Sequence, residues 1–111
     1  MDPINWADFE KLEMRVGTIL SAEAFAEARN PSYKLRIDFG AFGIKKSSAQ
    51  ITKFYTADDL VGRQVVAIIN FPPKQIGPFM SECLVLGAVD DEKGVTLLHP
   101  SLPVANGLRI A

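Results

Sequence analysis

The sequence predicts an all-β protein, a five-stranded OB-fold Greek-key barrel with a short helix between its third and fourth strands. Two observations support this fold. Short apolar or alternating segments are bounded by Gly, Pro and Asn, as strands are. Their order is strand, strand, strand, helix, strand, strand, which is the OB layout, whereas the alternative, an SH3-like barrel, usually lacks a helix at that place. The strands are expected at residues 14–25, 33–39, 44–51, 65–71 and 83–89, and the helix at 56–62.

The N-terminal segment predicts a short helix over residues 6–12, capped by Asn5. Trp6 and Phe9 recur at about helical spacing, so they form one apolar stripe that packs either on its own domain or on another subunit. In the strand that follows, Gly17 predicts a bend or bulge, as a strand needs when it serves both sides of a barrel.

The chain is expected to form one domain, residues 1–111, with an N-terminal helix (1–13), a barrel and last strand (14–98) and a tail (99–111). Its clearest half-buried strand is 33–39, where apolar and polar residues alternate. Residues 44–51 are mostly polar and should expose much of one face.

Two apolar runs, 65–71 and 83–89, flank eleven residues that contain Pro72, Pro73 and Pro78. Prolines fix φ and remove backbone donors, so this connection is predicted to be a stiff loop between core strands. It is more apolar than a solvated loop requires, and the excess is predicted to line a groove for an extended polypeptide. The candidate peptide-binding residues are Phe71, Pro73, Ile76, Phe79 and Met80.

The formal net charge of −1 predicts no bulk attraction to nucleic acid or to a membrane surface. Anion binding therefore requires cations gathered on one face. Antiparallel pairing of the first three strands is expected to bring five of the twelve Lys and Arg residues to one side, with two more nearby and with Phe54, Tyr55 and Phe79 available to stack bases. These candidate RNA-binding cations are Arg15, Lys34, Arg36, Lys45 and Lys46, together with Lys53 and Lys74.

The sequence contains no pattern of catalytic residues. His99 is the only histidine and Cys83 the only cysteine, and neither lies among acidic or nucleophilic partners. The glycines mark turns and form no phosphate loop. We therefore expect no enzyme, no metal site and no cofactor. No apolar run approaches the length of a membrane span, and no signal-peptide pattern opens the chain, so a cytoplasmic location without membrane insertion is expected.

Several short strings occur in a characteristic order: Arg15–Ile19, Asp38–Gly40, Asn70–Lys74, and Ser81-Glu82 before an apolar strand. In this order the chain resembles the tRNA-binding OB domain family, which ends some methionyl- and phenylalanyl-tRNA synthetases and also occurs free-standing. Residues 9–12 and 46–53 are most similar to its branch of export-related chaperones, CsaA. Synthetase-linked members typically carry Gly-Met where this chain has Cys83-Leu84.

The resemblance implies a homodimer that binds unfolded or precursor polypeptides, with tRNA as a second ligand and export machinery as a further partner. The alternative is a tRNA-binding or structured-RNA-binding module without a chaperone role. The matching strings add Asn70, Ser81 and Glu82 to the candidate RNA-binding residues. One barrel leaves apolar residues of both terminal segments uncovered, and a twofold interface would bury them. The candidate interface residues are Trp6, Phe9, Leu102, Val104, Leu108 and Ile110.

Overall fold

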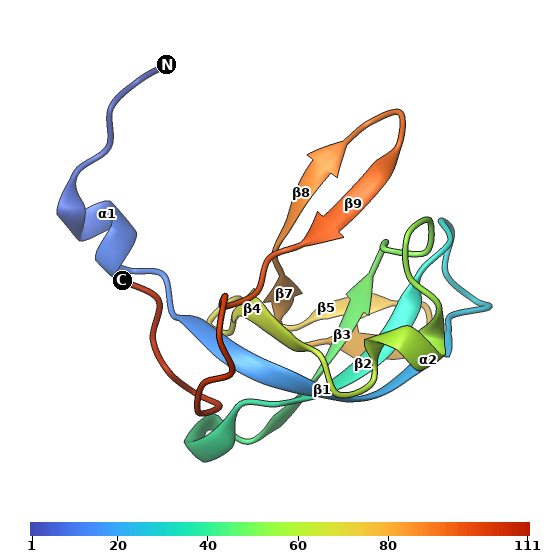
Figure 1. Cartoon of the computed structure of the whole chain (residues 1–111). Coiled ribbons are helices and arrows are strands. Elements are labelled where there is room, and N and C mark those ends of the chain that lie inside the picture. The colour runs from blue at the N-terminus through green and yellow to red at the C-terminus, as the bar shows by residue number, and fades with distance from the viewer.

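The computed structural model describes all residues, 1–111, and its centre is a nearly closed five-stranded antiparallel barrel (Figure 1). The predicted all-β, OB-like fold is confirmed. The strands follow the order β3-β2-β1-β4-β7. Their bounds are Met14–Ala24 for β1, Tyr33–Asp38 for β2, Ile44–Ala49 for β3, Gln64–Ile68 for β4 and Leu84–Val85 for β7.

The barrel encloses one apolar core, in which Leu35, Ile37 and Phe39 are fully buried. The predicted helix lies between β3 and β4 as α2 (Ala57–Leu60), and its Leu60 reaches the same core. The Oγ1 atom of Thr56 accepts a hydrogen bond from the Asp59 amide and caps this helix. A 3₁₀ turn, η1 (Gly40–Phe42), connects β2 to β3.

Strand β1 is shared between the two sides of the barrel. Residues 14–18 pair with β4 and residues 18–24 pair with β2, and the register shifts between Ile19 and Ser21. The expected bulge is therefore present, but it lies at Leu20 and not at Gly17. Gly17 has a different role, because a Cβ atom there would lie 2.6 Å from the Cγ2 of Ile37 and 2.7 Å from the ring of Phe39.

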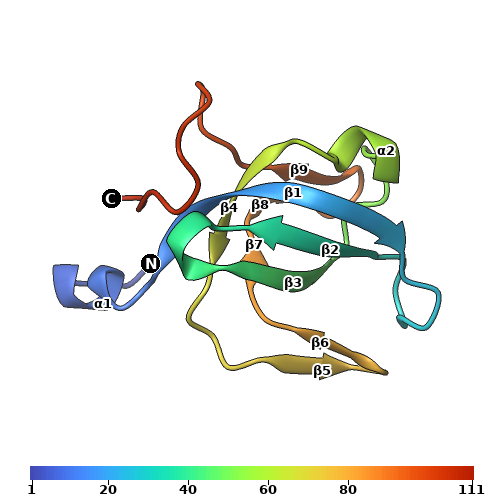
Figure 2. The same cartoon turned by 90° about the horizontal axis from the view of Figure 1, so that it is seen from below.

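The connection expected as a stiff loop contains a hairpin, β5 (Lys74–Ile76) paired with β6 (Phe79–Ser81). Gly77, with φ +55°, opens the two-residue Gly77-Pro78 turn, and a positive φ at that place suits a type II′ hairpin. Figure 2 shows the hairpin beside β3.

The apolar run predicted as one strand, 83–89, divides into two. Its first part is β7, which completes the barrel, and its second part is β8 (Gly87–Asp90), which pairs with β9 (Gly94–Leu97) in a separate hairpin. The β8–β9 hairpin projects from the barrel (Figure 1).

Helix α1 (Trp6–Glu10) is shorter than predicted and extends away from the barrel (Figure 1). Asn5 caps it through a full capping box with Asp8. The C-terminal tail is hydrogen-bonded to the first half of β1, where the Gly107 amide donates to the Val16 carbonyl and the Ile110 amide to the Met14 carbonyl.

Candidate binding surfaces

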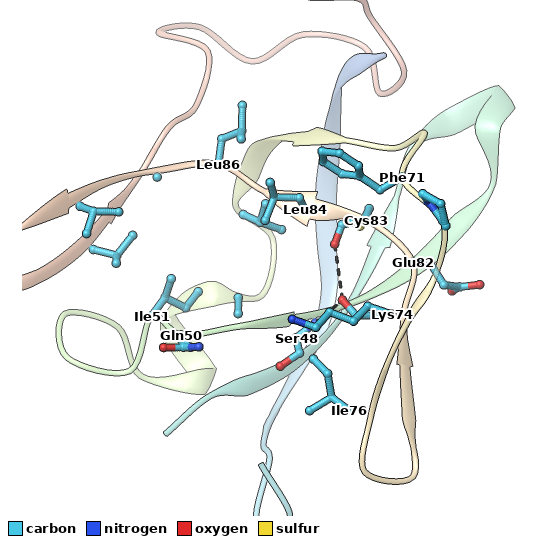
Figure 3. Close-up of a pocket in the computed structure, with 17 residues that line it drawn as sticks. Ser48, Gln50, Ile51, Phe71, Lys74, Ile76, Glu82, Cys83, Leu84 and Leu86 are labelled. Atoms are coloured by element: carbon cyan, nitrogen blue, oxygen red, sulfur yellow. Dashed lines mark hydrogen bonds between the residues drawn. The ribbon is translucent and has the colours of Figure 1, made fainter. Parts of the chain in front are cut away.

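A groove of about 780 Å³ lies between the β5–β6 hairpin, the end of β3 and the β7–β8–β9 segment (Figure 3). Ten of its 17 lining residues are hydrophobic, which suits an apolar ligand. Its apolar lining includes Ile51, Phe71, Ile76, Leu84, Val89 and Val95.

The groove exposes large apolar side chains that a solvated surface does not need. Phe71 is 48% exposed and Leu84 is 47% exposed, although Phe71 follows the core strand β4 and Leu84 belongs to the barrel strand β7. The polar residues that line the same groove are Ser48, Gln50, Lys74, Ser81 and Glu82. Such a groove suits an extended polypeptide, because its apolar lining can contact apolar side chains and its few polar groups can form hydrogen bonds with the peptide backbone.

Two of the five candidate peptide-binding residues, Phe71 and Ile76, line this groove, and Pro73, Phe79 and Met80 do not. Sequence reasoning missed Leu84, Val89 and Val95, because it confined the groove to the connecting loop. The signal for Leu84 and Val89 was the length of the apolar run 83–89, which exceeds what one short barrel strand can bury, whereas Val95 belongs to the next strand, β9.

Phe79 belongs to a different cluster. Its ring packs edge-on against Phe25, with ring centroids 5.3 Å apart. The Lys46 Nζ lies 5.3 Å from the Phe79 centroid and the Lys34 Nζ lies 5.9 Å from it. Lys34 also lies over Phe25, at 4.9 Å, and 3.9 Å from a carboxylate oxygen of Glu27. This cluster joins the β5–β6 hairpin to the outer faces of β2 and β3.

Three of the five expected cations share the outer face of the β2–β3 pair. Arg36 is directly opposite Lys46, and Lys34 is opposite Ser48, so their side chains leave the sheet on the same side. Two like charges directly opposite each other are unfavourable in a sheet. The pair therefore marks a place where an anion would relieve repulsion.

The placement expected for the other two cations is wrong. Lys45 is opposite the buried Ile37, on the other face of β3. Arg15 lies near the chain's C-terminal tail, where it pairs with Glu13 at 2.7 Å, donates to the Gly107 carbonyl and covers the ring of Phe42. Arg15 is thus occupied by contacts within the fold.

Acidic groups also lie on this outer face. Glu23 is opposite Lys34, and Asp38 lies two residues after Arg36 in β2, so its side chain points to the same face. The two remaining candidate cations lie elsewhere. Lys74 lines the groove, and Lys53 packs beside the glycine that opens β9, Gly94. The cationic surface is therefore small, and its centre is Lys34, Arg36 and Lys46.

Ser81 and Glu82 close the barrel where β3 and β7 leave a gap. The Glu82 carboxylate accepts from the Lys46 amide at 2.9 Å, and the Glu82 amide donates to the Lys46 carbonyl at 2.8 Å. The Ser81 Oγ accepts from the Ser48 amide at 3.1 Å. Side chains thus replace part of a missing strand ladder along the β3 edge.

Asn70 also makes contacts within the fold. Its Oδ1 accepts from the Glu13 amide at 3.0 Å, and its Nδ2 donates to the Lys11 carbonyl at 2.7 Å. These bonds join the end of β4 to the segment between α1 and β1.

Burial raises the pKa of the Cys83 thiol to about 11, an effect that a hydrogen bond with Ser47 and the charge of Lys45 only partly offset. The thiol is therefore neutral near pH 7. No three His, Cys, Asp or Glu side chains gather closely enough to hold a metal ion. None of the helices is long and apolar enough to span a membrane.

Three of the six candidate interface residues, Trp6, Leu102 and Leu108, are exposed in the single chain, and the other three, Phe9, Val104 and Ile110, are partly buried. Trp6 is 79% exposed and meets Phe9 edge-on, with centroids 6.4 Å apart. In the tail, Leu102 is 71% exposed and Leu108 is half exposed, whereas Val104 is held by backbone hydrogen bonds to the Gln64 side chain.

Comparison with known proteins agrees with this architecture. The family model described as a putative tRNA binding domain matches residues 14–109. The chain is 35% identical over 109 residues to a methionine–tRNA ligase of Porphyromonas gingivalis, a match that covers 98% of this chain and 16% of the ligase. A ligase of Thermococcus onnurineus is 36% identical over 107 residues, covering 96% of this chain and 14% of the enzyme. The chain thus spans about a sixth of the length of these relatives.

Two solved structures are similar over nearly their whole length. The chaperone CsaA of Bacillus anthracis has a TM-score of 0.94 and 50% identity, with 99% of this chain and all of the other covered. The CsaA chaperone protein of Picrophilus torridus has a TM-score of 0.92 and 48% identity, covering 98% and 100%. Taken with the match over residues 14–109, these similarities show that the chain belongs to the putative tRNA-binding domain family and is close in structure to the CsaA chaperones.

Proposed function

We propose that this protein is a homodimeric, CsaA-like chaperone that binds unfolded or precursor polypeptides in the groove beside the β5–β6 hairpin. The observation that carries the proposal is an apolar groove of about 780 Å³ that leaves Phe71 and Leu84 exposed. An extended apolar segment would cover both side chains. The similarity to two proteins described as CsaA chaperones supports the same function. We include delivery of precursors to export machinery in the same proposal.

A binding titration tests the groove. A fluorescently labelled, uncharged, leucine-rich peptide should bind the wild type, and Phe71→Asp should weaken binding about tenfold or more, because it places a charge against the apolar ligand. Phe54→Asp is the matched control, since Phe54 is 51% exposed but lies outside the groove. Equal loss in both variants, or in neither, would contradict the proposed site.

A second proposed activity is tRNA binding through Lys34, Arg36 and Lys46. The directly opposed Arg36 and Lys46 favour it, because phosphate would neutralise two like charges. The family match over residues 14–109 supports the same ligand. As an alternative to the chaperone, the protein would be an RNA-binding module alone.

Salt dependence tests the second activity. The affinity for tRNA should fall steeply as salt concentration rises, and Arg36→Gln should weaken binding and reduce the slope of log affinity against log salt by about one. Lys93→Gln, at the turn of the β8–β9 hairpin, is the control. A salt-independent affinity would exclude phosphate contacts. If tRNA binds and the peptide does not, the alternative is correct.

A further inference from the structure

We propose that the β5–β6 hairpin couples the two surfaces, so that an anion held by Lys34 and Lys46 releases Phe79 and weakens polypeptide binding in the groove. The inference rests on the proposed function, because it assigns a regulation to the same groove. It begins from one geometric fact, namely that the hairpin contributes side chains to both surfaces.

Ile76 and Phe79 are directly opposite each other in the hairpin, so they share one face. Ile76 lines the groove, whereas Phe79 contacts Phe25, Lys34 and Lys46. Both hairpin strands are three residues long, and an isolated hairpin of this kind has little stability of its own. Its position depends on contacts with the barrel.

Those contacts lie at the two ends of the hairpin. At the base, the Ser81 Oγ accepts from the Ser48 amide in the seam with β3. Beside the turn, Phe79 contacts the ring of Phe25 and the ammonium groups of Lys34 and Lys46. Gln75 and Met80 have the opposite parity and face away from this cluster.

The two lysines have a stronger alternative partner than an aromatic ring. An ammonium group forms short, charge-assisted hydrogen bonds with phosphate, whereas its attraction to an exposed ring is weak. A polyanion on the β2–β3 face would therefore draw both Nζ atoms away from Phe79. The turn end of the hairpin would then lose the two ammonium contacts of Phe79 and keep its contact with Phe25.

A loosened hairpin changes the groove, because Lys74 and Ile76 form part of its wall. A polypeptide would then have to order this wall on binding, which lowers its affinity. Linkage requires the reverse effect as well, so a bound polypeptide should weaken anion binding by the same factor. We expect tRNA to weaken peptide binding about fivefold or more.

The test measures the anisotropy of the labelled leucine-rich peptide at low salt, with and without saturating tRNA. The wild type should lose affinity when tRNA is present, and Met80→Leu, the control on the other face of the same strand, should behave identically. Phe79→Leu keeps an apolar contact with Phe25 but loses the ring. This variant should bind the peptide weakly and show no response to tRNA.

Three outcomes overturn the coupling. One is an unchanged peptide affinity although both ligands bind. Another is full sensitivity to tRNA in Phe79→Leu, which would indicate direct overlap of the ligands. The third outcome is independent of the proposed function, because it is measured without any ligand. The coupling requires that the amides of residues 74–81 exchange hydrogen faster in Phe79→Leu than in Met80→Leu. Equal exchange in the two variants would show that Phe79 does not hold the hairpin in place. Failure of either ligand to bind the wild type would count against the proposed function alone.

Discussion

The Asn70 side chain joins two parts of the fold by hydrogen bonds of opposite direction. Its oxygen accepts a hydrogen bond from the Glu13 amide and its nitrogen donates one to the Lys11 carbonyl, so the segment that follows α1 is fixed to the end of β4. The two bonds use one N–H donor and one acceptor lone pair of the amide, and they give the side chain a structural role. Its presence in a family-like string is explained by the position of α1.

Asn70→Asp should separate the two bonds, because it keeps the acceptor and removes the donor to Lys11. We expect a loss of about 1 kcal/mol in the free energy of unfolding, measured by urea denaturation. Affinity for tRNA should be the same as for the wild type once the added charge is screened by salt. A large loss of tRNA affinity at unchanged stability would return Asn70 to the RNA-binding residues.

Cys83 connects stability to alkaline pH. Its pKa is raised to about 11 by burial, whereas an exposed thiol in the unfolded chain ionises near pH 9. The folded state thus binds more protons between these values, so stability is full below pH 9 and falls as the pH rises through 11. The loss attributable to this thiol is at most about 3 kcal/mol.

Urea denaturation of the wild type and of Cys83→Ala between pH 8 and 11 measures this contribution. The variant should be less stable at pH 8 because it loses a buried side chain, and its stability should depend less on pH above 9. Parallel pH profiles would show that Cys83 is not the source of the alkaline loss.

At the scale of elements, the seam between β3 and the β6–β7 connection is the part of the barrel that lacks a regular strand ladder. Ser81 and Glu82 hold it mainly with side-chain acceptors, whereas the other barrel strands are joined by regular ladders. The seam also carries the base of the β5–β6 hairpin. Its strength therefore affects both the barrel and one wall of the groove.

Glu82→Ala should destabilise the protein by about 1 to 2 kcal/mol, because the Lys46 amide loses its acceptor. Glu82→Gln is the matched control, since its amide oxygen can take the same place. Urea denaturation should rank wild type and Glu82→Gln together and Glu82→Ala below them. If Glu82→Gln is as unstable as Glu82→Ala, the negative charge matters more than the hydrogen bond.

The elements also show how far the sequence was predictive. Alternation placed β2 well, because residues 33–38 have one buried and one solvated face. The length of the run 83–89 exceeds one short strand, but the place where it divides was not predicted, since the division follows from pairing with different strands, β4 and β9. The hairpin β5–β6 was missed although Gly77-Pro78 fits its turn.

The candidate surfaces were predictable only in part, for a related reason. Strand alternation puts the adjacent Lys45 and Lys46 on opposite faces, and the pairing with β2 shows that Lys46 is the one that shares the face of Arg36. The sequence-based prediction placed both lysines on one side of the paired strands. Likewise, Ser81 and Glu82 were conspicuous as polar residues before an apolar strand, but only the spatial neighbour β3 explains them.

At the scale of the whole molecule, the main unexplained feature of a single chain is its uncovered apolar surface. Trp6, Leu102 and Leu108 all lie outside the barrel core, on the two terminal segments. A twofold contact would bury the same patch on both subunits. The proposed homodimer would remove this apolar surface from water on both subunits.

Sedimentation at micromolar concentration should give twice the chain mass of 12.2 kDa. Trp6 is the only tryptophan, so its emission reports the same event and should move to shorter wavelength as the dimer forms. Trp6→Asp removes that reporter but should yield a monomer by sedimentation. A wild-type monomer of 12.2 kDa would refute the dimer.

The pairing of the C-terminal tail with β1 brings both ends of the polypeptide to the same side of the barrel (Figure 1). A flexible linker joining Ala111 to Met1 would therefore leave every strand ladder intact. New termini opened at the solvent-exposed turn between β8 and β9 should give a circular permutant with the same fold. In that permutant the strand β9 would begin the chain and β8 would end it, so the order of synthesis would change while the barrel remained the same.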